Sequence, residues 1–134
     1  MASQRILSRK SDNRNHLYRN LATSLVLYEK VDTTEAKSKE LKRLIDKLIS
    51  TAKKNDLSAR RAMSAYLFDN NAVDKMFDVL VPRYSSISSG FSTLAKIASR
   101  KGDGAMTCRV ELINPEIKTA KISAPKKDND DKDK

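Results

Sequence analysis

The chain has 134 residues, of which 39% are hydrophobic and 33% charged, and 27 Lys+Arg against 17 Asp+Glu give a net charge of +10. This composition supports one domain with a modest core and argues against full disorder, and no apolar run is long enough to span a bilayer. A single cysteine, Cys108, and a single histidine, His16, exclude an intramolecular disulfide and a Cys/His zinc cluster. The basic excess predicts a polyanionic partner, with nucleic acid first.

Residues 1–13 lack apolar periodicity, and we interpret them as an extended basic arm. The stretch before Asp12 is rich in Arg and Ser without an acid, a composition that also occurs in organelle transit peptides, although it is short for one. Ser11 or Asp12 is the expected N-cap of a first helix. That helix is predicted to end near Glu29, from apolar residues spaced by three and four, namely Leu17, Tyr18, Leu21, Leu25 and Tyr28.

Residues 30–34 are β-branched at Val31, Thr33 and Thr34 and predict a brief strand. A second helix follows, capped by Asp32 or Thr33, with Glu35 in its first turn. Its periodicity is the clearest in the chain, through Leu41, Leu44, Ile45, Leu48, Ile49 and Ala52.

Asn55-Asp56 breaks and recaps the chain before a third helix over residues 57–68. Its apolar candidates are Leu57, Met63, Tyr66 and Leu67. A short fourth helix starts at Asn70-Asn71 and should end at Pro82, because proline disfavours the α conformation just before it. Its inward positions are Val73, Met76, Phe77 and Leu80.

Residues 106–112 alternate between apolar and polar, which predicts a half-buried strand. The Gly-Asp-Gly turn before it favours residues 91–99 as the hairpin partner, although that segment also suits a helix. The mixed Lys and Asp residues of 115–134 predict a disordered tail. We therefore expect an α+β domain over residues 14–114, with two layers, a small mixed sheet and the order helix, strand, three helices, two strands.

Nothing in the sequence predicts catalysis, a cofactor, a metal site or a small-molecule substrate. A Ser-His-Asp triad would need His16, which lies in the densest basic run and suits a surface position near phosphates. The segment around Gly102 lacks the glycine spacing and Lys-Ser/Thr ending of a phosphate loop. Cys108 falls on the apolar face of its strand and is expected in the core.

The basic residues are distributed over the arm, helix starts and loops. A sequence-specific DNA-binding protein usually concentrates its contacts on one recognition helix. Dispersed basic residues better suit a folded RNA with phosphates on several sides. The predicted RNA contacts are Arg5, Arg9, Lys10, Arg14, Arg19, Lys37, Lys39, Arg43, Arg60, Arg61, Arg83, Arg100 and Lys101. Two alternatives stay open: a nucleoid-type protein that coats DNA, and a hydrolase using Asp103, Glu111 and His16.

The order and spacing of motifs along the chain resemble those of the ribosomal protein L-seventeen family of the bacterial large subunit. The matches span residues 5 to about 114 and include Arg14, Arg19-Asn20-Leu21, Ser24-Leu25, Glu29, Thr33-Thr34, Lys37, Lys39-Glu40-Leu41, Leu48-Ile49, Ala52-Lys53, Arg60-Arg61, Val81-Pro82-Arg83-Tyr84, Arg100, Gly102-Asp103, Ala105 and Val110-Glu111-Leu112. The resemblance implies a non-enzymatic, two-layer protein of the cytoplasmic ribosome, with an organellar ribosome less favoured. It further implies contacts with 23S-type large-subunit rRNA and with neighbouring proteins near the exit-tunnel side.

The chain departs from the family pattern at two places. Asn13-Arg14 stands where the family usually has His-Arg. The loop over residues 87–94 lacks two arginines and one glycine of the family motif, on which the family's usual RNA contacts in this loop would depend. Phe91 in this loop could stack on a base or belong to the core.

Overall fold

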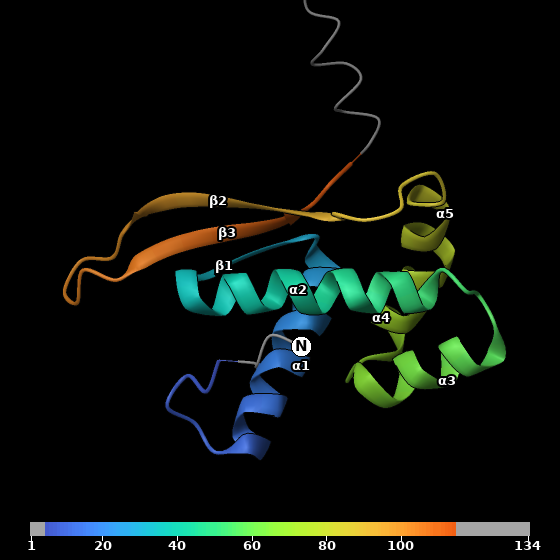
Figure 1. The fold of residues 1–134 in the computed structure, drawn as a ribbon, viewed down its shortest axis with the longest axis horizontal. Coiled ribbons are helices and arrows are strands. Elements are labelled where there is room, and N and C mark those ends of the chain that lie inside the picture. Colours follow the sequence, from blue (N-terminus) through green and yellow to red (C-terminus); the bar gives the residue numbers. More distant parts are fainter. Residues whose placement is uncertain (1–4, 115–134) are drawn as a thin grey trace, which may run out of the picture.

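The computed structural model describes residues 5–114, so the predicted tail over residues 115–134 lies outside the described part of the chain. The predicted α+β class and element order are confirmed (Figure 1). The elements are α1 (Ser11–Tyr28), β1 (Lys30–Thr34), α2 (Glu35–Ala52), α3 (Leu57–Tyr66), α4 (Asn70–Lys75), the π-helical turn η1 (Met76–Leu80), α5 (Val81–Arg83), β2 (Ser92–Ser99) and β3 (Met106–Leu112).

The three strands form one sheet in the order β1-β3-β2, and both pairings are antiparallel. The predicted mixed sheet is therefore wrong. The helices bring the chain back into β2 in the same direction as β1, and the hairpin then reverses it, so that β3 runs opposite to both of its neighbours. β2 and β3 form the expected hairpin around Gly102 and Gly104, which both have positive φ angles, of 105° and 64°. A bulge at Ile97 interrupts the hairpin register and leaves that side chain half exposed.

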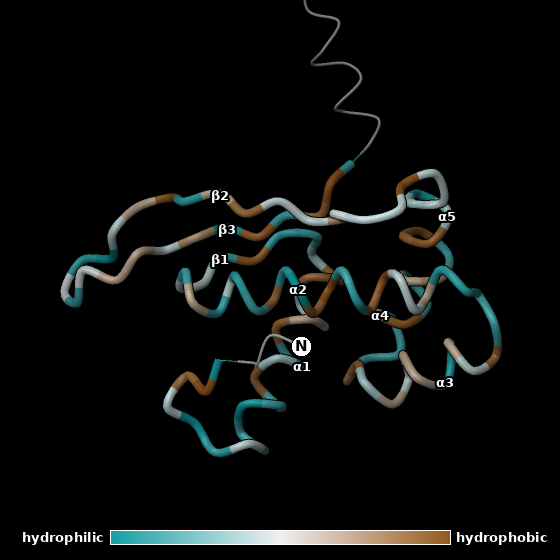
Figure 2. The backbone as a smooth tube through the Cα atoms, in the orientation of Figure 1, coloured by the Kyte–Doolittle hydropathy of each residue, from teal (hydrophilic) through white to brown (hydrophobic). Residues whose placement is uncertain are grey.

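The helices cover one face of the sheet, with α2 running alongside the strands (Figure 1). The distal half of the hairpin extends past the beginning of α2, and β2 is exposed from Ala95 onward. The residues around the hairpin turn are mostly hydrophilic, whereas the start of the described chain has a short hydrophobic stretch between hydrophilic residues (Figure 2). The sheet thus contributes to the core at one end and presents an exposed turn at the other.

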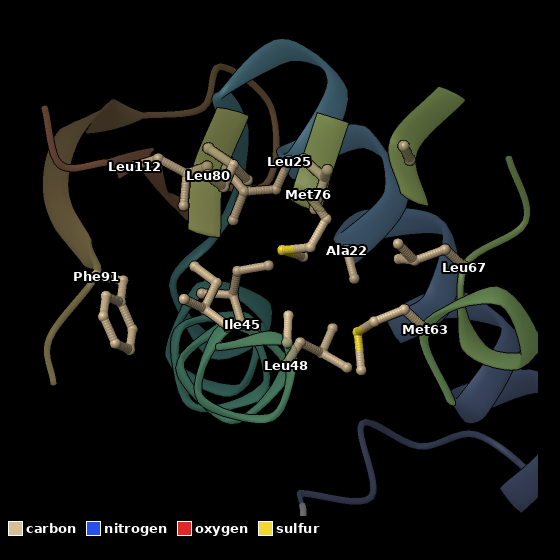
Figure 3. Close-up of a cluster of buried hydrophobic side chains, with 14 of the residues drawn as sticks. Ala22, Leu25, Ile45, Leu48, Met63, Leu67, Met76, Leu80, Phe91 and Leu112 are labelled. Atoms are coloured by element: carbon tan, nitrogen blue, oxygen red, sulfur yellow. The ribbon is translucent and has the colours of Figure 1, made fainter. Parts of the chain in front are cut away.

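The core lies between α2 and the surrounding elements (Figure 3). The predicted stripe on α2 supplies its centre, with Leu41, Ile45 and Ile49 fully buried. The predicted inward residues of the fourth helix are also buried, and so is Cys108 on β3. On α1, Tyr18 and Leu25 are buried as predicted and Ala22 and Val26 join them, while Tyr28 is 71% exposed. Leu57, a predicted core candidate, is 65% exposed.

The predicted caps of the first two helices are wrong. α1 begins at Ser11 with Lys10 as N-cap, so residues 11–13, which the sequence assigned to the arm, form its first turn. α2 is preceded by Thr34, and neither helix has a side-chain cap hydrogen bond. The Asp56 prediction is confirmed, since its carboxylate accepts from the Ala59 N–H at 2.6 Å.

The fourth helix does not end at Pro82. Its path widens into the π-helical turn η1, where the Val81 N–H donates to the Met76 carbonyl, and then continues as α5 to Arg83. Pro82 stands at the start of α5, a position where the missing N–H costs little. This continuation carries Arg83 and the buried Tyr84 back toward α1 and β2.

Glu29 joins the helical layer to the sheet. Its backbone has a left-handed conformation with φ 60°, its N–H donates to Leu25, and its carbonyl accepts from the Leu112 N–H at 2.9 Å. Arg83 donates to both Glu29 carboxylate oxygens at 2.7 and 3.2 Å. The Lys75 Nζ lies 3.0 Å from Oε1 of the same carboxylate. Hydrogen bonding from Arg83 lowers the pKa of Glu29 below its ordinary 4.5, although partial burial opposes that shift.

We expect Glu29→Gln to lower the free energy of unfolding at pH 7 by about 1–3 kcal/mol, because Arg83 and Lys75 lose their anionic partner. Since folding lowers the pKa of Glu29, its contribution is present above the unfolded value near 4.5 and is lost as the pH falls through the lower folded value. The difference between the two proteins should therefore shrink at pH 3, as measured by urea denaturation. Glu111→Gln, at a half-exposed carboxylate on β3, is the matched control and should stay within about 0.5 kcal/mol of the parent. Equal stability of Glu29→Gln and the parent at pH 7 would contradict this role.

Candidate nucleic-acid interface

The predicted contact residues differ in how much of their charge is available at the surface. Among the described residues, several have no ion-pair partner and are at least partly exposed: Arg9, Lys10, Lys37, Arg61 and Lys101. They lie on four separate elements: the segment before α1, α2, α3 and the hairpin turn. The structure thus does not gather the available bases onto one recognition helix.

Bases along the start of the chain and α2 surround a buried acid. The Glu40 side chain is only 5% exposed, and Arg5 and Arg43 each approach one of its oxygens at 3.5 Å. Lys39 pairs with Glu35 one turn away, at 2.7 Å. Glu40 compensates one positive charge, so Arg5 and Arg43 together still carry a surplus toward solvent.

A hollow of about 470 Å³ lies between α1, α2 and α3. Its lining combines apolar side chains such as Met63 with Arg43, Lys47 and Glu40. A second hollow of about 320 Å³, between the start of the chain, α2 and β3, is lined in part by Arg5, Lys39 and Met106. Both hollows therefore have basic side chains at their walls.

The two ends of the molecule carry further bases. At the hairpin turn, Arg100 donates from Nε and Nη2 to the two carboxylate oxygens of Asp103, whereas Lys101 is exposed without an ion-pair partner in residues 5–114. The hydrogen bond from Arg100, and then that from the Ala105 N–H, lower the pKa of Asp103 to about 2. On α3, the Arg60 guanidinium carbon lies 4.6 Å from the centroid of the Phe77 ring.

Three of the predicted contact residues turn toward the protein itself. Arg83 is committed to Glu29, as described above. Arg19 donates from Nε to the Tyr66 carbonyl at 2.7 Å and from Nη2 to the Ala65 carbonyl at 2.8 Å. These carbonyls belong to the last turn of α3, so Arg19 caps that helix from α1. Arg14 is partly buried, with its Nε enclosed.

Sequence reasoning missed the aromatic contacts around Arg19. Its guanidinium carbon lies 4.1 Å from the centroid of the Phe68 ring, and His16 stacks on the same Phe68. His16 and Arg19 are three residues apart on a helix, a spacing that places both on one side of α1. That spacing was readable, but the position of Phe68 opposite them was not.

The Phe91 alternatives are resolved by burial. Phe91 is fully buried, with its ring centroid 5.2 Å from that of Tyr84. Its N–H donates to the Asp46 carboxylate at 3.0 Å, and Lys53 donates to the Ile87 carbonyl, so α2 anchors the loop at both ends. Phe91 is a core residue, and stacking of this ring on a base is excluded in this conformation.

The described residues contain no group of His, Cys, Asp and Glu side chains arranged to hold a metal ion. No helix within residues 5–114 combines the length and apolar character needed to cross a membrane. The residues of the hydrolase alternative lie apart along the fold, with His16 on α1, Asp103 in the hairpin turn and Glu111 on β3. Asp103 is occupied by Arg100, as expected for an acid that balances a base.

Fold and surface together define a small basic α+β domain of the kind that binds a polyanion through several elements. The family model described as Ribosomal protein L17 matches residues 17–113. The large ribosomal subunit protein bL17 of Caldanaerobacter subterraneus subsp. tengcongensis is 41% identical over 83% of this chain and 99% of its own. The bL17 proteins of Endomicrobium trichonymphae and Clostridium perfringens (strain SM101 / Type A) are 47% and 38% identical, over 77% and 84% of this chain and 88% and 100% of theirs. The chain belongs to the ribosomal protein L17 family.

Arg19→Ala should destabilise the fold by about 1–3 kcal/mol, because two carbonyls at the end of α3 lose a charged donor. The matched variant is Arg61→Ala, at an exposed arginine of α3 without an ion-pair partner in the described chain, and its change should stay within about 0.5 kcal/mol. Urea denaturation at neutral pH measures both. Equal effects of the two substitutions would show that Arg19 has no capping role.

Proposed function

We propose that this protein is a structural constituent of the large ribosomal subunit that binds and stabilises large-subunit rRNA and thereby supports translation. Membership of the ribosomal protein L17 family carries the proposal, and the named relatives are themselves large-subunit proteins. The dispersed, unpaired bases support it physically, since a folded RNA offers phosphates on several sides. No catalytic step is part of this function.

The predicted contacts divide into two groups in this proposal. The outward group would neutralise phosphates, and it comprises Arg5, Arg9, Lys10, Lys37, Arg43, Arg60, Arg61 and Lys101. Lys39 and Arg100 are also exposed, but each already pairs with an acid, Glu35 or Asp103, and would contribute less. Arg19 and Arg83 would instead act mainly by holding α3 and α5 in position, and Arg14 is partly buried and less available to a phosphate. The hairpin turn with Lys101 and α3 with Arg61 lie at opposite ends of the molecule (Figure 1), so they would reach different RNA segments.

We further propose 23S-type rRNA as the RNA partner, a location in cytoplasmic ribosomes near the exit-tunnel side, and contacts with neighbouring large-subunit proteins. The basic N-terminal arm, the domain over residues 14–114 and a charged tail over residues 115–134 remain the proposed division of the chain. The arm would follow phosphates and lose conformational entropy when it binds.

The salt dependence of RNA binding tests the outward group. With about six phosphates neutralised, log K should fall with log[salt] at a slope of roughly −4 to −5. Arg61→Ala and Lys101→Ala should each reduce the slope by roughly 0.7–0.9. Fluorescence anisotropy with protein-free large-subunit rRNA measures these slopes.

Arg109→Ala is the matched control, because its guanidinium already pairs with Asp32 through two contacts of 2.6 and 2.8 Å. It should leave the slope unchanged. An affinity of the parent protein that does not depend on salt would contradict phosphate binding. Equal affinity for duplex DNA of any sequence would favour the nucleoid-type alternative.

Assembly is tested by sedimentation of the tagged full chain from a cell lysate on a sucrose gradient. The proposal expects co-migration with the large subunit that persists through a moderate salt wash. Sedimentation at the top of the gradient, or with DNA, would overturn it.

A further inference from the structure

One surface feature is not used by phosphate binding: the exposed aromatic pair of His16 on α1 and Phe68 between α3 and α4. Their ring centroids are 5.7 Å apart and their planes differ by 3°, so the two rings are stacked in parallel. His16 is exposed, and Phe68 keeps 47% of its surface in solvent. Two parallel flat rings at the surface therefore stand outside the core to which the other phenylalanines belong.

Contacts with Arg19 and Thr23 hold the Phe68 side of the pair in place. Arg19 lies against Phe68 and is itself fixed by its two hydrogen bonds to the end of α3. The Phe68 N–H donates to Thr23 Oγ1 at 3.3 Å, and Thr23 in turn donates to the Arg19 carbonyl at 2.8 Å. Because the backbone and one flanking group are already ordered, a further planar group could stack here at little additional entropic cost.

Burial does not explain why these rings are where they are. A phenylalanine that remains about half exposed gains only part of its transfer free energy, and a histidine on the outer side of a helix gains still less. What the parallel arrangement does provide is a flat, partly solvated surface that another aromatic plane can extend. Nucleobases stack on aromatic side chains in this way without sequence preference.

The surroundings of the pair favour a nucleic acid. Asn13 and Asn20 are exposed on α1 at three residues before and four residues after His16, which places them on the same side of the helix. Their amides can donate to and accept from base edges. Arg19 donates a hydrogen bond to the Ala65 carbonyl on α3, and Arg61 lies one turn before Ala65 on the same helix. Arg61 is exposed, so its charge is available to a phosphate. Asp69, next to Phe68, directs its carboxylate to the Asn71 N–H at the start of α4.

We infer that His16 and Phe68 form a stacking platform for one unpaired nucleobase of the bound RNA. This inference rests on the proposed RNA binding and adds a base-stacking contact to it. The ligand is an unstacked purine or pyrimidine in a single-stranded loop or bulge, with its phosphates neutralised by neighbouring bases of the outward group. His16 would contribute the ring that contacts the base, and Phe68 would support it.

The test compares two short probes with the full chain. One is a hexa-adenylate RNA carrying a central 2-aminopurine, and the other is an abasic hexamer with the same number of phosphates. The parent protein should bind the adenylate probe roughly fivefold or more tightly than the abasic one, the effect of at least one stacked base. The 2-aminopurine fluorescence should be quenched on binding.

His16→Ala and Phe68→Ala should each remove most of that preference and the quenching, while the affinity for the abasic probe stays unchanged. His16→Tyr should retain both, because it keeps an aromatic ring. Arg61→Ala is the charge control and should weaken binding of both probes to the same extent. His16 is at the surface, so its substitution tests the platform even if Phe68→Ala proves unstable.

Failure of the platform and failure of RNA binding give different results. If the protein binds both probes equally and His16→Ala changes neither, the platform is overturned while phosphate binding stands. If the parent binds neither probe nor protein-free large-subunit rRNA, the proposed RNA binding itself is overturned. If His16→Ala leaves rRNA and probe binding intact but weakens co-sedimentation with the subunit, the rings contact a protein neighbour instead, which also overturns the inference.

Discussion

The carboxylate of Glu29, held by Arg83 and Lys75, is the contact on which the relation of helices to sheet depends. Glu29 follows the last residue of α1, and its carbonyl accepts a hydrogen bond from β3. Its carboxylate pairs with Lys75 at the end of α4 and with Arg83 in α5. Three segments far apart in the chain therefore meet at one residue in a left-handed conformation, which costs a non-glycine residue about 1–2 kcal/mol. The surrounding hydrogen bonds offset that cost, and they fix the helical layer against the sheet.

Basic side chains serve two purposes in this molecule. Arg19 and Arg83 direct their guanidinium donors at a helix end and a carboxylate of their own chain. Arg61 and Lys101 extend from the surface without an ion-pair partner in residues 5–114. A guanidinium satisfied by fixed internal acceptors has few donors left for a phosphate, whereas an unpaired one brings its full charge. The division follows from geometry and separates the residues that hold the fold from those proposed to bind RNA.

The loop before β2 shows how an aromatic residue can be assigned only by its neighbours. Phe91 is enclosed by Tyr84 and anchored to α2 through Asp46, although it follows a polar, serine-rich segment. Phe68 directly follows Tyr66 and the buried Leu67 and yet lies half in solvent against His16. The residues next to each ring in the chain therefore suggest an exposed Phe91 and a buried Phe68, whereas the structure buries Phe91 and exposes about half of Phe68. Hydrophobicity sets the tendency of a ring to be buried, but the available space is decided by elements distant in the chain.

The sequence by itself determined the helices and strands, the α2 stripe, the Asp56 cap, the hairpin and the excess of positive charge, because these follow from local periodicity, turn chemistry and composition. Its motif order also indicated the family. Only the tertiary structure decided the antiparallel direction of β1, the passage of the helix through Pro82, and the inward roles of Arg19 and Arg83. Each of these depends on partners tens of residues away, and local patterns carry no information on which distant group a side chain or strand will meet.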